Sequence, residues 1–161
     1  MKIGSRVIGN GRPTFVIAEL GANHNGDSEI AYQMILAAHH AGVDAVKFQC
    51  RTPELAIPPE QQGVLKQTPW QPEPMTYLDY RRRLELSEAA IGELSRFARG
   101  LGLECFASVW DRPSVARCIR AINPPCLKIP SACLTDDDLL RALPATGLPV
   151  ILSTGMSTET Q

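Results

Sequence analysis

Ile17-Ala-Glu-Leu-Gly-Ala-Asn-His-Asn-Gly26 joins a short apolar run to a polar, glycine-containing turn, and Asp27-Ser28 then opens a helical pattern. An apolar strand, a polar turn and a capped helix in this order are typical of the start of a βα unit. In folds built from such units, functional groups gather where the carboxyl end of a strand meets its loop. Glu19 lies at that place, and Asn23 and His24 follow it. We therefore expect the functional site to begin here.

Composition narrows the class of protein. The chain has 161 residues, of which 44% are hydrophobic and 20% charged, as in an ordinary globular domain. A formal net charge of −1 gives no broad basic field for nucleic acid or an anionic membrane. No apolar run approaches the roughly 20 residues of a membrane helix, and the amino terminus lacks the apolar core of a signal peptide. We expect a cytoplasmic protein whose five cysteines are reduced and mostly buried.

Strand-like and helical patterns alternate along the chain. We predict an N-terminal hairpin over 2–12, with its turn at Gly9-Asn10-Gly11, and a long, irregular, proline-rich loop over 50–80. Strands are predicted at 14–19, 44–49, 103–108, 125–129 and 148–153, and helices at 28–41, 88–100, 112–121 and 135–143. The expected buried stripe of the first helix is Ile30, Met34, Ala37, Ala38 and Ala41. Ser87 is expected to cap the second helix, Asp111 to open the third and Thr135 to cap the fourth. Thr158-Glu-Thr-Gln161 reads as the capping box of a fifth, so we expect a truncated chain.

Two architectures fit five βα repeats within residues 14–161. One is a doubly wound sheet of flavodoxin type, which suits the length. The other is the first five-eighths of a (β/α)8 TIM barrel, which normally needs about 200 residues or more. The opening hairpin, the polar strand ends and the terminal helix signal favour the incomplete barrel.

Alternation along the strands places one polar side chain from each strand on a common face. These side chains are Glu19, Lys47, Ser108, Lys128 and Ser153, with Ser131 just beyond the fourth strand. A single lysine at a strand end more often extends to solvent. Two lysines that share a face with hydroxyls and an acid instead favour a site for a small, multiply charged anion, such as a phosphate-bearing carboxylate. Glu19 would serve there as a general acid or base.

The histidines carry weaker signals. His24, taken alone, is more often a residue that tethers a loop than a ligand. His39 and His40 are adjacent on a helix, so their side chains point about 100° apart and we do not expect a chelating pair.

Four segments carry a family likeness. They are Ile17-Ala-Glu-Leu-Gly-Ala-Asn-His-Asn-Gly-Asp27, Ala45-Val-Lys-Phe-Gln49, Leu127-Lys-Ile-Pro-Ser131 and Ile151-Leu-Ser-Thr-Gly-Met156. Together they resemble the sialic acid synthase (N-acetylneuraminate synthase) family, which includes the legionaminic and pseudaminic acid synthases. The resemblance spans essentially the whole chain. It implies that residues 1–161 are one N-terminal portion of a (β/α)8 barrel, without the family's small C-terminal antifreeze-like domain.

The resemblance also implies an activity. Family members condense phosphoenolpyruvate with an N-acetylated aldose, such as N-acetylmannosamine, to give a nonulosonic acid and phosphate. A divalent metal, manganese or magnesium, polarises the sugar aldehyde. Its histidine ligands come from later strands, so the resemblance places no metal ligand in this chain. The full-length form is expected to be a homodimer.

Matching by position assigns roles to particular residues. Glu19 corresponds to the catalytic acid. The phosphoenolpyruvate clamp is expected from Lys47, Ser108, Lys128, Ser131 and Ser153, and weaker sugar contacts from Asn23, His24 and Gln49.

Two departures and two alternatives stay open. Ser108-Val-Trp-Asp111 stands where family members often carry Ser-Thr-Pro-Phe, so one hydroxyl contact is missing or moved. Cys133 stands where several sugar-binding members carry an acid, so the sugar is not fixed. A Schiff-base aldolase on the same fold would use Lys47 or Lys128 as its nucleophile. A non-catalytic half-barrel that binds anions is the other alternative. We expect little turnover from the 161-residue chain alone.

Overall fold

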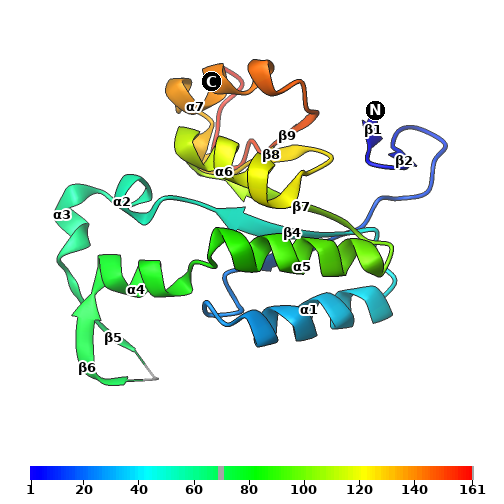
Figure 1. The fold of residues 1–161 in the computed structure, drawn as a ribbon. Helices are drawn as coiled ribbons and strands as arrows, with labels where there is room; N and C mark the ends of the chain where they lie inside the picture. The colour runs from blue at the N-terminus through cyan, green and yellow to red at the C-terminus, as the bar shows by residue number, and fades with distance from the viewer. Residues whose placement is uncertain (69–70, 161) are drawn as a thin grey trace.

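The computed structural model describes residues 1–68 and 71–160 (Figure 1). Pro69, in the predicted long loop, and Gln161, the last residue of the predicted capping box, lie outside the described residues.

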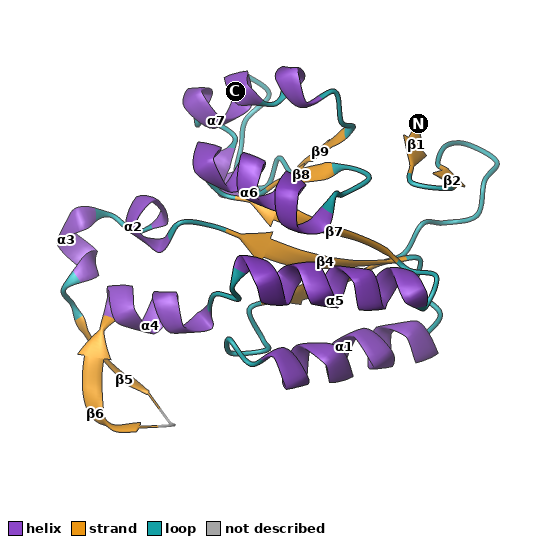
Figure 2. Cartoon of the chain, in the orientation of Figure 1, coloured by secondary structure: helices purple, strands orange, loops and turns teal. Residues whose placement is uncertain are grey.

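A five-stranded parallel sheet forms the centre of the structure (Figure 2). Its strands are β3 (Ile17–Gly21), β4 (Ala45–Cys50), β7 (Glu104–Val109), β8 (Leu127–Ile129) and β9 (Val150–Leu152). They follow one another in the order β3-β4-β7-β8-β9, so each new strand is added beside the previous one. A doubly wound sheet would instead reverse its winding direction at a switch point. The observed order is that of five consecutive units of a (β/α)8 barrel.

The main hydrophobic core lies between the sheet and the helices. The principal helices are α1 (Ser28–His40), α5 (Glu88–Gly100), α6 (Arg112–Ile122) and α7 (Asp137–Ala142). Buried residues of all four join one cluster with alternate residues of the strands, such as Phe48, Ala107 and Ile129. The helices therefore cover one face of the sheet, and the opposite face corresponds to a barrel interior.

The opposite face carries a second, smaller cluster of Ala45, Phe106 and Cys126, together with Ile3 of the N-terminal hairpin. This hairpin pairs β1 (Lys2–Ile3) with β2 (Arg6–Val7). The Ser5 N–H donates to Glu104 Oε1 over 2.9 Å at the start of β7. The hairpin therefore packs on the amino-terminal ends of the strands.

The predicted irregular loop over 50–80 is wrong, because most of this segment has regular structure. It contains α2 (Pro53–Ala56), α3 (Pro59–Gln62), an antiparallel pair of β5 (Leu65–Thr68) and β6 (Gln71–Thr76), and α4 (Tyr77–Leu84). Pro53 and Pro59 stand at the first positions of short helices, where the missing N–H costs nothing. Pro72 and Pro74 lie on β6 of the two-stranded pair, where a strand edge tolerates proline.

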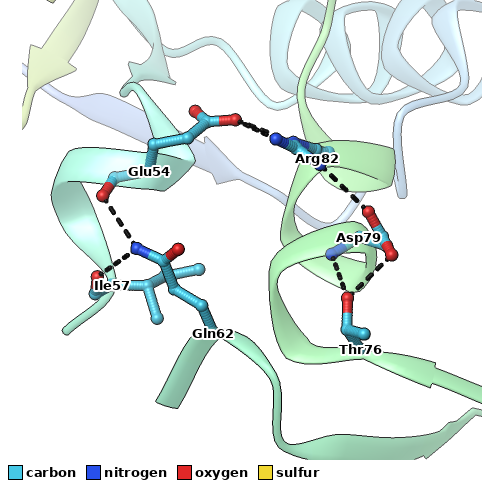
Figure 3. Close-up of polar contacts among 6 residues, drawn as sticks. All are labelled: Glu54, Ile57, Gln62, Thr76, Asp79 and Arg82. Carbon is cyan, nitrogen blue, oxygen red and sulfur yellow. Dashed lines mark hydrogen bonds and ion pairs between the residues drawn. The ribbon is translucent and has the colours of Figure 1, made fainter. Parts of the chain in front are cut away.

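Polar contacts hold this segment together (Figure 3). Arg82 Nε donates to Glu54 Oε1 over 2.7 Å, which links α4 to α2. Gln62 Nε2 donates to the carbonyl of Ile57 over 3.1 Å. Thr76 caps α4 by accepting from the Asp79 N–H. In Figure 1 the segment extends away from the sheet beyond the carboxyl end of β4.

Several predicted boundaries need correction. The hairpin turn lies at Gly4-Ser5 rather than Gly9-Asn10-Gly11, because Gly4 adopts a φ of +55°. The first sheet strand begins at Ile17, not at residue 14, so Glu19 lies inside it. Asp136, not Thr135, caps α7. Residues 159 and 160 form a turn, and the helix expected after the capping box would lie past the described residues, so it stays a prediction.

The buried face of α1 also differs from the predicted stripe. Ala31, Ile35 and Ala38 are buried, whereas Ile30 is 42% exposed. Because alanines occupy several neighbouring positions, the apolar pattern is too broad to predict which face of α1 is buried. The predicted caps Ser87 of α5 and Asp111 of α6 are confirmed.

The five cysteines are free and buried, as predicted. Among residues 1–68 and 71–160, no helix combines the length and the apolar character needed to cross a membrane.

Candidate active site

The predicted polar side chains lie on the face opposite the helices, at the carboxyl ends of the strands. Glu19 of β3 is the register partner of Lys47 of β4, and Ser108 of β7 is the register partner of Lys128 of β8. Lys47 follows Ala45, a member of the smaller core cluster, by two positions along the strand. Alternation therefore brings these four side chains to one face.

Lys47 occupies the centre of this group. Lys47 is only 3% exposed, although a lysine side chain ordinarily carries a positive charge. The Nζ atom donates to Ser108 Oγ over 2.6 Å and lies 3.5 Å from Glu19 Oε1. Burying a cation is costly unless it is paired and hydrogen-bonded, and Ser108 and Glu19 meet that requirement from two neighbouring strands.

Burial lowers the pKa of Lys47 below its usual range. The carboxylate of Glu19 opposes this shift, whereas the charge of Lys128 adds to it. A ligand with two or more negative charges would relieve both the desolvation and the lysine–lysine repulsion. The geometry is therefore suited to an anion that lies between Lys47 and Lys128.

Glu19 differs from Lys47 in its access to solvent. Its side chain is 65% exposed, so it lines the open side of the group. A carboxylate in this place can reach both Lys47 and a molecule that enters from solvent. That position suits a group that exchanges protons with a substrate.

Ser131 and Ser153 adjoin the group at the ends of β8 and β9. Ser131 starts a short 3-10 helix, η1 (Ser131–Cys133), and the Ser153 N–H donates to the carbonyl of Ile129 over 3.1 Å. A Cβ built at Gly155 would lie 3.5 Å from Ser131 Oγ. The loop that follows Ser153 therefore folds over Ser131, on the Lys128 side of the site.

Asn23, His24 and Gln49 belong to the rim formed by the β3–α1 loop and the end of β4. Asn23 Nδ2 donates to the carbonyl of Leu20 over 3.2 Å. His24 is 4% exposed, and its Nδ1 accepts from the Gly26 N–H over 3.1 Å. Burial lowers the pKa of His24. His24 thus tethers its own loop, whereas a sugar contact by any of the three residues stays a prediction.

Sequence reasoning missed Arg51 and Glu85. Arg51 is 3% exposed and pairs with Glu85, the residue that ends α4. Its guanidinium lies 5.8 Å from the centre of the Trp110 ring. Strand alternation could have indicated Arg51, because it lies two residues after Gln49 and four after Lys47 and so falls on the same face.

The two departures from the expected motifs have structural roles. Asp111 caps α6 and accepts from the Thr52 N–H over 2.6 Å, which ties the end of β4 to the end of β7. Cys133 is 7% exposed, and its thiol lies 3.5 Å from the carbonyl oxygen of Trp110. Cys133 therefore packs inward.

Within residues 1–68 and 71–160, no group of three His, Cys, Asp or Glu side chains is arranged to hold a metal ion. The resemblance expects the ligands of the divalent metal from later strands, so we assign none of these residues to it.

The NeuB family model matches residues 34–161 of the chain. The chain belongs to the NeuB family. It is 35% identical to an N,N'-diacetyllegionaminic acid synthase of Legionella pneumophila and 31% identical to an N-acetylneuraminate-9-phosphate synthase of Homo sapiens. These alignments cover 95% and 94% of this chain but 43% and 42% of the relatives.

A solved structure gives the same result. An N-acetylneuraminic acid (sialic acid) synthetase from Leptospira borgpetersenii serovar Hardjo-bovis, in complex with citrate, superposes with a TM-score of 0.84 at 28% identity. The superposition covers 99% of this chain and 51% of that one. The NeuB-family chain described here thus spans about half the length of the relatives it matches.

Proposed function

We propose that this chain forms the phosphoenolpyruvate-binding part of a NeuB-family synthase that makes nonulosonic acids. The observation that carries the proposal is the buried Lys47, paired with Glu19 and Ser108 and next to Lys128. The relatives named as legionaminic and N-acetylneuraminate-9-phosphate synthases support the class of product. The acceptor is an N-acetylated aldose, N-acetylmannosamine or a related sugar.

Binding of phosphoenolpyruvate follows from charge. Lys47 and Lys128 would neutralise its phosphate and carboxylate groups, and the hydroxyls of Ser108, Ser131 and Ser153 would donate to the remaining oxygens. Because the anion stabilises the ammonium form, the pKa of Lys47 would rise on binding.

The condensation then proceeds in two stages. The methylene carbon of phosphoenolpyruvate attacks the aldehyde carbon, so a C–C bond forms and the aldehyde oxygen takes up a proton. The enol carbon becomes an oxocarbenium centre, to which water adds with loss of a proton. The C–O bond of the tetrahedral intermediate breaks, phosphate leaves with the electron pair, and the new hydroxyl loses its proton to give the 2-keto group.

Glu19 is the residue placed to move these protons. Its exposed carboxyl group, 3.5 Å from Lys47 Nζ, would give a proton to the aldehyde oxygen or take one from the attacking water. In the whole protein, manganese or magnesium would polarise the aldehyde oxygen when bound. Asn23, His24 and Gln49, on the neighbouring rim, are proposed to contact the sugar.

The proposal extends to the whole protein in two ways. The 161-residue chain would have little or no turnover alone, because it spans about half the length of its relatives. The complete protein is inferred to be a cytoplasmic homodimer, and five reduced, buried cysteines agree with a reducing compartment.

Calorimetric titration with phosphoenolpyruvate tests the proposal. Lys47→Met should weaken binding to the chain by about tenfold or more, since it removes a charge-assisted contact. Lys2→Met makes the same change in charge at the exposed amino end and should bind like the wild type. Equal affinity in the wild type and Lys47→Met would contradict the assignment.

The lowered pKa of Lys47 favours one other candidate, a Schiff-base aldolase. In that reaction the neutral amine would attack the keto group of pyruvate and release water. Borohydride reduction in the presence of pyruvate would then leave a covalent adduct on Lys47. We expect no adduct, because the contacts to Glu19 and Ser108 favour the ammonium form.

A further inference from the structure

Arg51 and Glu85 form an ion pair that is largely removed from solvent. Their side chains are 4% and 19% exposed, and Arg51 Nε donates to Glu85 Oε1. Arg51 directly follows β4, the strand that carries Lys47 and Gln49, whereas Glu85 is the last cap residue of α4. The pair therefore joins the end of a site-bearing strand to the junction between α4 and α5.

Arg51 is itself fixed by neighbouring elements. Its carbonyl accepts from the guanidinium of Arg117 in α6 over 2.6 Å, and its own guanidinium lies against the ring of Trp110 after β7. Because two other elements hold Arg51, it offers Glu85 an anchor that does not depend on α4.

The contacts continue from α4 to the β3–α1 loop. A Cβ at Gly26 would lie 2.0 Å from the carbonyl oxygen of Arg83, so this loop rests directly on the last turn of α4. Beside this contact, the loop, the end of β4 and the end of α4 surround a narrow depression. Its lining includes His24, Gln49, Arg51, Leu84 and Glu85.

We propose that Arg51 and Glu85 are positioning residues for the sugar side of the site. The pair holds the end of α4 against β4, and α4 in turn fixes the β3–α1 loop that carries Asn23 and His24. This inference rests on the proposed function, because that function assigns the loop to the sugar. Neither residue touches the reacting atoms in this scheme.

A positioning pair and a merely stabilising pair differ in what fails when the pair is broken. Loss of general stability would speed exchange in the core at least as much as in the loop, because core amides open mainly through global unfolding. Loss of positioning would speed exchange in residues 22–27 while α5 and β7 stay protected. It would also move the NMR signals of the His24 ring, because His24 and Arg51 line the same depression and the charge of Arg51 acts on His24.

The experiment compares hydrogen exchange and the His24 signals in the wild type, Glu85→Met and Arg51→Lys. Glu85→Met leaves a buried guanidinium without its carboxylate, and we expect exchange to rise about tenfold more in the loop than in the core. Arg51→Lys keeps the charge and should retain wild-type loop exchange. Arg120→Met, which breaks the exposed pair with Glu88 on α5 and α6, is the matched control and should leave the loop unchanged.

The double variant Arg51→Met/Glu85→Met covers the case in which Glu85→Met does not fold. It removes both charges with similar side-chain volume, which is usually tolerated in a core. Loop exchange should rise in it as well. Wild-type exchange in the loop of either variant, or an equal rise in loop and core, would overturn the inference.

The two proposals are separable in this experiment. Hydrogen exchange is measured without ligand, so it tests the pair even if the wild type fails to bind phosphoenolpyruvate. Phosphoenolpyruvate affinity, measured in parallel, should stay within about twofold of the wild type in Arg51→Lys and the double variant, because the Arg51–Glu85 pair shares no partner with the Lys47 contacts.

Discussion

The ammonium of Lys47 donates to the hydroxyl of Ser108 over 2.6 Å across the β4–β7 boundary, and both residues are almost fully buried. This hydrogen bond is made by a cation inside the protein, where an unsatisfied charge is expensive. Ser108 is thus part of the means by which the sheet keeps a buried lysine ready for an anion.

Ser108→Ala should remove that acceptor and destabilise the chain by about 1.5–3 kcal/mol, the range for a hydrogen bond to a charged group. Urea denaturation measures the change. Ser95→Ala is the control, because buried Ser95 donates to the neutral carbonyl of Ile122 over 3.3 Å and its loss should cost about 1 kcal/mol. A smaller cost at 108 than at 95 would show that Lys47 does not depend on Ser108.

Lys47 should contribute to the pH dependence of the stability of the chain. Burial lowers its pKa in the folded chain below the ordinary value of 10.5. Between these two pKa values the unfolded chain binds more protons than the folded chain, so this residue makes stability rise with pH across that window. Urea midpoints measured from neutral pH to 10.5 should rise less in Lys47→Met than in the exposed control Lys2→Met. Equal slopes would contradict the prediction.

Anion binding should have the opposite pH dependence. As pH rises through the lowered pKa of Lys47, the free protein loses the cation that holds the ligand, so phosphoenolpyruvate affinity should fall before pH 10.5. Within this range, binding should also take up protons. Calorimetry in two buffers of different ionisation enthalpy measures that uptake, and its absence in the wild type would rule out a role for Lys47.

Gly26→Ala should be much more damaging than Gly42→Ala. Both glycines have positive φ, of +78° and +74°, so alanine costs about 1–2 kcal/mol at either position. At Gly42 a Cβ meets nothing within 4 Å, whereas at Gly26 it meets the backbone oxygen of Arg83 at 2.0 Å. The free energy of unfolding from urea titration should therefore separate the two variants, and similar losses would mean that the loop and α4 are not in contact.

Trp110→Phe should change stability by less than about 1 kcal/mol. The buried Nε1 atom of Trp110 has no hydrogen-bond partner among the described residues, so its removal leaves no group unsatisfied. Phenylalanine also keeps an aromatic face for Arg51. Trp110→Ala, by contrast, should cost about 3–5 kcal/mol through the cavity it leaves. A large loss in Trp110→Phe would point to a water or ligand bound to the indole.

The sequence was sufficient to predict the βα order and the polar face, because both depend on short-range periodicity. Glu19, Lys47, Ser108 and Lys128 could be grouped because alternation in a strand has a strict period of two. The helix caps Ser87 and Asp111 were equally local signals.

What the sequence could not supply depended on contacts between distant segments. Prolines over 50–80 suggested irregular structure, but their place at the first turn of α2 and α3 is visible only when the helices are present. Arg51 and Glu85 are 34 residues apart, so no local pattern linked them. The stripe of α1 was ambiguous because alanine fits a buried or an exposed face equally well.

The N-terminal hairpin contacts Glu104 and Asp44 at one rim of the sheet, and the candidate site lies at the other. The contacts of the hairpin lie on the amino rim, while the ionisable groups of the site occupy the carboxyl rim. Substitutions that strengthen the hairpin contacts should therefore leave ligand affinity unchanged. Thermal stability and substrate preference can then evolve independently in this architecture.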